Sequence, residues 1–125
     1  MNGLRLKMRR RGMDFKPFDV VVVPFPFTEK LAEKRRPALI VSSTLFNKEH
    51  DHLILAMITT AKNSVWSSDI ELNDWKQAKL MVPCKVRFKL FTLDRQLIAL
   101  RLGSLSTSDK EAVKSAMKLF LATEE

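Results

Sequence analysis

The chain has 125 residues and is poor in the features that define several common protein classes. Its single cysteine, Cys84, excludes an internal disulfide framework. No apolar run approaches the roughly 20 residues that a membrane-spanning helix needs. The N-terminal segment lacks the apolar core of a secretory signal, so we expect a cytoplasmic protein without a membrane partner. With only three glycines there is no glycine-rich phosphate loop, which disfavours nucleotide hydrolysis.

Positive charge is concentrated at the N-terminus. Residues 1–12 contain five of the 22 lysines and arginines and no acidic residue, whereas the remainder is only mildly basic. Such a segment is typical of a disordered tail that adds nonspecific attraction to nucleic acid. The rest of the chain is long enough to bury roughly two thirds of its unfolded surface. We therefore expect a basic tail over 1–12 and one domain over 13–125.

Short apolar runs predict a mainly β fold. Strands are expected over 20–23, 38–43 and 53–60, with a short strand over 69–72. Residues 81–90 alternate most clearly between apolar and basic side chains, and strand-like material continues to 102, although 95–102 is also compatible with a helix. Gly103 is expected to mark a bulge or turn.

Helical signals are fewer. Ser43 or Thr44 is a candidate cap for a short helix over 45–49, and a single turn is expected over 74–78. Ser108 and Glu111 are spaced as a capping box before a C-terminal helix with one apolar stripe. The stripe consists of Val113, Ala116, Met117, Phe120 and Leu121. The fold class expected is α+β, mainly an antiparallel barrel with a C-terminal helix.

Arg35, Arg36 and Pro37 stand where a polar loop leads into the second strand. Pro37 disfavours the helical conformation for Arg36 and holds it extended. One interpretation is a surface arginine paired with Glu29 or Glu33, the usual fate of surface charge. The other is a phosphate ligand, because a guanidinium donates two parallel hydrogen bonds to phosphate oxygens and keeps its charge.

Lys85, Arg87 and Lys89 share one face of the alternating strand. If that face is exposed, the three cations form a track for backbone phosphates. Basic side chains on a strand serve equally well to prevent edge pairing. Both interpretations are compatible with the sequence.

His50, His52, Trp66 and Trp75 are weaker candidates. The two histidines flank an aspartate in a polar turn without further metal ligands nearby in sequence, so a solvated loop is favoured over a metal site. Packing is favoured over base stacking for the two tryptophans.

Several segments occur in the order and approximate spacing of the MazF/PemK toxins of bacterial type II toxin–antitoxin systems. They are FDVVVVPFPFT, KRRPALIVS, LAMITT and KVRFKLFTLD with a following LGSLS. The chain resembles this family over about residues 15–121. The resemblance implies an SH3-like barrel that forms a homodimer and cleaves single-stranded RNA at short motifs through its 2′-hydroxyl, without a metal or other cofactor. It also implies a cognate antitoxin as partner.

The resemblance implies catalytic roles for Arg36, which precedes the proline of the family's RP motif, for Thr59 and for Arg87. Where the PemK branch has an aspartate two residues after the arginine that matches Arg87, this chain has Lys89 or has lost one residue. The first loop also departs from the glycine and serine common in relatives, so we expect it to be stiffer. The other predicted RNA contacts are Lys34, Arg35, Thr60, Lys85 and Lys89.

Two alternatives remain open at this point. A noncatalytic toxin of the same barrel type, acting on a protein such as DNA gyrase, would lose toxicity with Arg36→Ala but would cleave no RNA. A plain RNA-binding module would tolerate Arg36→Ala, lose affinity when residues 1–12 are deleted, and weaken steeply with salt.

Overall fold

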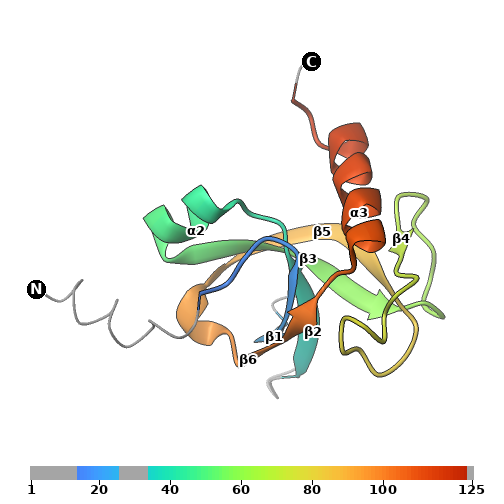
Figure 1. Ribbon diagram of the computed structural model, residues 1–125, viewed down its shortest axis with the longest axis horizontal. Helices are drawn as coiled ribbons and strands as arrows, with labels where there is room; N and C mark the ends of the chain where they lie inside the picture. Colours follow the sequence, from blue (N-terminus) through green and yellow to red (C-terminus); the bar gives the residue numbers. More distant parts are fainter. Residues whose placement is uncertain (1–13, 26–33, 124–125) are drawn as a thin grey trace, which may run out of the picture.

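The computed structural model describes residues 14–25 and 34–123, whose strands form one six-stranded antiparallel sheet that curls into a half-barrel (Figure 1). The strand order is β4-β5-β3-β2-β1-β6. The elements are β1 (Asp19–Pro24), β2 (Arg35–Ile40), α2 (Thr44–His50), β3 (His52–Thr60), β4 (Ile70–Glu71), β5 (Cys84–Asp94), the 3₁₀ turn η1 (Arg95–Leu97), β6 (Leu100–Ser104) and α3 (Thr107–Phe120). The predicted antiparallel β architecture with a C-terminal helix is confirmed.

The sheet buries apolar side chains on both faces. Alternate residues of β1 enter two different clusters, Val20 with Val86 and Val113 on one side, and Val21 with Leu55 on the other. Because successive strand residues point to opposite faces, this division explains the unbroken valine run. In the described part of the chain, no helix is long and apolar enough to cross a membrane.

Strand β2 begins three residues earlier than predicted and ends at Ile40 rather than Ser43. Its pairing with β1 continues through Val22 opposite Pro37 and Val23 opposite Arg36. Because of this antiparallel pairing, Arg35 and Arg36 belong to the sheet and not to the preceding loop. Arg36 is therefore a strand residue, in the extended conformation expected before a proline.

Strand β5 contains a bulge that the sequence did not predict. Ala56 of β3 lies opposite Leu90, whereas the next residue, Met57, lies opposite Arg87, so Phe88 and Lys89 are inserted between these pairs. The bulge interrupts the predicted alternation. The interpretation of an exposed basic stripe is wrong, because Lys85 and Arg87 are buried and only Lys89 is exposed.

The N-terminal caps of the two helices differ in how well they match prediction. Ser43 caps α2, as expected, by accepting a hydrogen bond from the Phe46 amide at 3.2 Å. The cap of α3 is Ser106 rather than Ser108, with its Oγ accepting from the Asp109 amide at 3.1 Å. The buried Asp109 carboxylate in turn accepts from two backbone amides of residues 73 and 74. Segment 74–78 forms the single turn that was predicted, in which the Ala78 amide donates to the Asp74 carbonyl oxygen at 3.2 Å.

The apolar stripe of α3 is only partly covered. Val113 is fully buried, Met117 packs on the core, and Phe120 remains 49% exposed while contacting Phe88 edge to face. Figure 1 shows α3 on the side of the sheet that carries β4, away from α2. The helix therefore covers one end of the curled sheet rather than its whole open face.

Gly103 marks a bulge, as predicted. Val20 pairs with Gly103, whereas Val21 pairs with Arg101, so Leu102 is the extra residue in β6. A Cβ at Gly103 would lie 3.1 Å from the Ala78 carbonyl oxygen, which is closer than ordinary contact. The glycine lets the 74–80 turns approach the sheet closely beside the cavity described below.

Candidate functional site

A cavity of about 330 Å³ lies where β2 and β3 meet the turn at residues 79–82. Arg36 and Pro37 line it from β2, and Thr59 and Thr60 line it from the end of β3. The register of these strands, with Ala38 opposite Met57, directs Arg36 toward Thr59 although 23 positions separate them in the sequence. The structure thus brings together three of the eight predicted site residues.

Arg36 is held by packing rather than by a carboxylate among the described residues. Its guanidinium carbon lies 5.6 Å from the centre of the Phe25 ring, in cation–π contact. Its Nε is buried and has no hydrogen-bond partner in the part of the chain that the structure describes. A buried donor without a partner favours binding of an acceptor from outside. The alternative partners Glu29 and Glu33 lie outside the described residues.

Thr59 presents a buried hydroxyl to the same cavity. The residue is 6% exposed, and its Oγ1 accepts a hydrogen bond from Asn63 Nδ2 at 2.5 Å. Since a hydroxyl has one hydrogen to donate and two acceptor positions, its own hydrogen remains to be donated. Thr60 is exposed at the cavity edge.

Beside this cavity lies a buried charge cluster formed by Asp69, Lys85 and Arg87. Arg87 donates to Asp69 from Nε at 3.0 Å and from Nη2 at 2.8 Å, and Lys85 Nζ lies 3.2 Å from Asp69 Oδ2. The hydrogen bond from Arg87 is the main reason that the pKa of Asp69 is lowered to about 2. The same bond raises the pKa of Arg87. Neither Lys85 nor Arg87 lines the cavity.

The two cations of this cluster also hold a loop by its backbone. Lys85 Nζ donates to the carbonyl oxygens of Asn63 and Ser64, at 2.9 and 3.1 Å. Arg87 Nη2 donates to the Ser64 carbonyl as well, and its guanidinium stacks over Trp66 at 4.8 Å from the ring centre. Segment 61–69 is therefore fastened to β5 at its middle.

The remaining predicted residues lie outside the cavity. Lys34 and Arg35 are exposed at the start of β2, and Lys89 is exposed in the bulge of β5. The histidine pair is exposed, with His52 Nδ1 at 2.9 Å from the His50 carbonyl oxygen, in keeping with the solvated-loop interpretation.

Sequence reasoning missed Asn63 and Lys79, which line the cavity, and Asp69, which belongs to the charge cluster. Asn63 lies in the polar connection before the expected strand over 69–72 and Asp69 at the start of that strand, and neither belongs to a recognisable motif. Asp69 pairs with a strand residue 18 positions away, and Asn63 is defined only by its contacts with Thr59 and Lys85.

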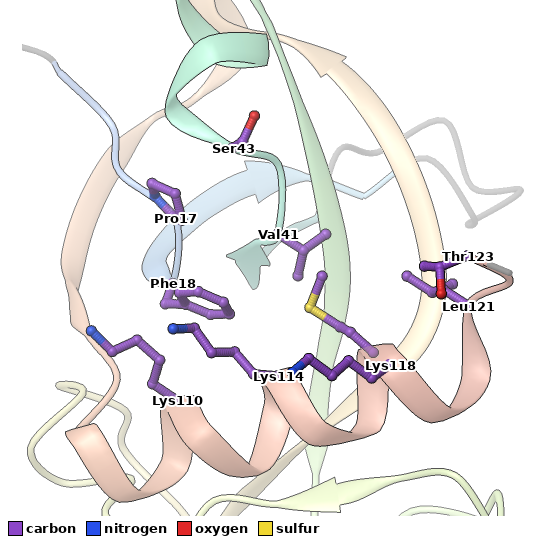
Figure 2. A pocket seen from close by; sticks show the side chains of 10 residues that line it. Pro17, Phe18, Val41, Ser43, Lys110, Lys114, Lys118, Leu121 and Thr123 are labelled. Carbon is purple, nitrogen blue, oxygen red and sulfur yellow. The ribbon is translucent and has the colours of Figure 1, made fainter.

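A second, larger cavity of about 780 Å³ lies between α3 and the segments around Phe18 and Val41 (Figure 2). Lys110, Lys114 and Lys118 of α3 line it, each one turn of helix apart. None of the eight predicted site residues lines this cavity.

The fold and the first cavity define a small antiparallel half-barrel protein with an arginine and a threonine in one pocket. Residues 16–121 match the model of the family described as PemK-like, MazF-like toxin of type II toxin-antitoxin system. The chain therefore belongs to the PemK/MazF toxin family, as its resemblance implied.

Solved structures of other proteins share the fold of this chain. A mycobacterial endoribonuclease, solved in complex with its cognate antitoxin, has a TM-score of 0.69 at 14% identity, over 90% of this chain and 98% of that one. MazF from Deinococcus radiodurans has a TM-score of 0.66 at 20% identity, over 87% and 97% of the two chains. At such identities the likeness concerns the fold. A search of curated proteins found no match.

Proposed function

We propose that this toxin is an endoribonuclease that cleaves single-stranded RNA at short sequence motifs without a metal ion. The observation that supports this most is the cavity shared by Arg36 and Thr59, in which Nε of Arg36 is buried without a partner among the described residues. The mycobacterial and Deinococcus structures of the same fold are described as an endoribonuclease and as MazF.

The proposed reaction is attack of the RNA 2′-oxygen on the adjacent phosphorus. A new 2′-oxygen to phosphorus bond forms, the bond to the 5′-oxygen breaks, the 2′-hydroxyl loses its proton, and the leaving 5′-oxygen gains one. The products are a 2′,3′-cyclic phosphate and a 5′-hydroxyl end. Negative charge builds up on the phosphate oxygens in the transition state, so fixed donors aimed at them accelerate the step.

Arg36 and Thr59 supply those donors in this proposal. The Arg36 guanidinium donates to nonbridging oxygens, and the Thr59 hydroxyl donates to the same phosphate and orients the 2′-hydroxyl. Asp69 is a poor general base at neutral pH, since its pKa is lowered to about 2 by Arg87.

In this proposal the exposed residues Lys34, Arg35, Thr60 and Lys89 contact the RNA on either side of the cut, because their side chains reach solvent where a flexible backbone can approach. Lys85 and Arg87 act indirectly, because their charges are buried against Asp69.

We further propose that the toxin acts in the cytoplasm as a homodimer and is neutralised by a cognate antitoxin. MazF of Deinococcus radiodurans has been solved with MazE, with a TM-score of 0.69 and 15% identity to this chain. Acidic residues of an antitoxin would complement the exposed Lys34 and Arg35 at the start of β2.

The test is incubation of the purified protein with a long single-stranded RNA in the presence of a chelator, followed by mapping of cut positions and end groups. Discrete cuts with cyclic-phosphate ends, lost in Arg36→Ala and Thr59→Val, are expected. Arg101→Lys and Thr92→Val are matched controls, because both residues are exposed on strands outside the cavity. They should retain wild-type cleavage.

Other outcomes distinguish the alternatives. Intact RNA under all conditions, from a folded protein that remains toxic, would favour a noncatalytic toxin. Cleavage that requires an added metal ion would contradict the metal-independent mechanism. Cuts that persist in both Arg36→Ala and Thr59→Val would place the chemistry elsewhere.

A further inference from the structure

Asn63 joins the cavity to the buried charge cluster. Its side-chain amide donates to Thr59 Oγ1 at 2.5 Å, while its backbone carbonyl accepts from Lys85 Nζ at 2.9 Å. Thr59 lies directly opposite Lys85 in the pairing of β3 with β5. A continuous set of contacts thus runs from the ion-paired lysine, through the loop residue, to the hydroxyl in the cavity.

The direction of the hydrogen bond determines what the Thr59 hydroxyl can do. The carboxamide nitrogen of Asn63 is a donor, so the threonine oxygen is occupied as an acceptor on that side. The hydroxyl hydrogen is then left to point away from Asn63. A strand threonine without this neighbour would rotate its hydroxyl among several partners.

The loop itself is rigidly placed for this task. Its backbone is held by Lys85 and Arg87, whose side chains are only 3% and 8% exposed and share the carboxylate of Asp69. The backbone N–H of Asn63 also closes a turn by donating to the Thr60 carbonyl oxygen at 3.1 Å. Positioning within fractions of an ångström requires such support from surrounding groups.

We propose that Asn63 is a positioning residue, which rests on the proposed ribonuclease function. Its carboxamide fixes the Thr59 hydroxyl as a hydrogen-bond donor toward the RNA phosphate in the Arg36 cavity. Lys85 and Arg87 serve the reaction through this loop and do not touch the RNA. Asn63 acts only through Thr59, which makes the two side chains energetically coupled.

A double-mutant cycle tests the coupling. Asn63→Ala removes the carboxamide but keeps both backbone hydrogen bonds of the loop. In the wild-type background it should lower kcat about tenfold or more and change KM less than about threefold. In the Thr59→Val background the same substitution should change kcat less than about twofold, because the hydroxyl it orients is already absent.

Two further variants separate positioning from simple support of the turn. Asn63→Asp keeps the shape and turn preference of asparagine but cannot donate, so it should lose at least as much activity as Asn63→Ala. Asn73→Ala, at an exposed asparagine of another turn, is the matched control and should retain full activity. All variants should unfold at the wild-type temperature within a few degrees.

The outcomes keep the two proposals apart. If the wild type cleaves RNA and Asn63→Ala has the same effect with and without the Thr59 hydroxyl, the positioning role is overturned while the ribonuclease function stands. Full activity of Asn63→Asp would overturn it equally. If the wild type does not cleave RNA at all, the proposed function fails and the positioning role falls with it.

Discussion

Arg36 and Arg87 are both strand arginines matched to the same toxin family, yet their surroundings are opposite. Arg87 is buried, donates twice to Asp69 and stacks on Trp66. Arg36 packs on Phe25, lines a cavity and leaves its Nε without a hydrogen-bond partner among the described residues. A guanidinium that is already ion-paired within the protein gains little by binding a phosphate. A buried guanidinium nitrogen without a hydrogen-bond partner gains more from such binding.

The contrast separates a structural cation from a ligand-binding one. Arg87 and Lys85 stabilise the loop that supports Thr59, so their loss should appear mainly as instability. Arg36 holds no loop in place among the described residues. Substituting it should therefore lower the rate of catalysis more than the stability of the fold. Each of the following predictions tests one side of this division.

The largest effect is expected at Arg36. Arg36→Gln should lower kcat about 10²- to 10³-fold, the usual cost of removing one donor from a developing anion. The free energy of unfolding should change by less than about 1 kcal/mol, since no carboxylate among the described residues loses a partner. Steady-state cleavage kinetics and urea unfolding measure the two quantities. A strong loss of stability would show that Arg36, like Arg87, has a structural role, and would contradict this prediction.

A large loss of stability is expected at Asp69. Asp69→Asn leaves two buried cations without their counter-charge, and breaking such a cluster costs about 3–5 kcal/mol. The midpoint of urea unfolding should fall accordingly, while RNA affinity of the folded fraction changes little. Glu71→Gln, at an exposed carboxylate of β4, is the control and should leave the midpoint unchanged. An unchanged midpoint for Asp69→Asn would contradict the structural role.

A smaller effect should follow from pH. The pKa of Asp69 is about 2 in the folded protein against a reference value of 3.8, so its ionised form is favoured by folding. The resulting stabilisation, about 2 kcal/mol, is complete above about pH 5 and is lost as pH falls through 2. Unfolding free energies of wild type and Asp69→Asn should converge over this range. Parallel pH profiles would show that Asp69 does not carry this effect.

The smallest effects are expected at the exposed cations. Lys89→Gln or Arg35→Gln should weaken binding of a noncleavable RNA less than about threefold at physiological salt. Each should reduce the slope of log affinity against log salt by about 0.7 if its charge meets a phosphate. Fluorescence anisotropy at several salt concentrations measures that slope. An unchanged slope would show that the substituted residue does not contact an RNA phosphate.

The sequence predicted the architecture where local patterns were decisive. The valine run of β1, the apolar run of β3 and the Ser43 cap of α2 follow directly from side-chain type and spacing. The cap of α3 was misplaced because Ser106 and Ser108 each precede an acidic residue by three positions. Only the packing of Asp109 against the turn at residues 73 and 74 distinguishes them.

The site was predictable only in part. Family motifs indicated Arg36 and Thr59, and strand register brings them to one cavity. The burial of Lys85 and Arg87 was not predictable, since it depends on a bulge and on a carboxylate from a distant loop. Asn63 carries no motif, because only one side-chain hydrogen bond across a turn connects it to Thr59.

The most direct test compares the two arginines in one experiment. A short RNA taken from a mapped cut, with a 2′-deoxy nucleotide at the scissile position, binds without being cleaved. Nuclear magnetic resonance of the arginine Nε–H groups then follows both residues during titration. The Arg36 resonance should shift strongly while that of Arg87 stays unchanged. A shift of Arg87 with Arg36 unaffected would contradict the division between them.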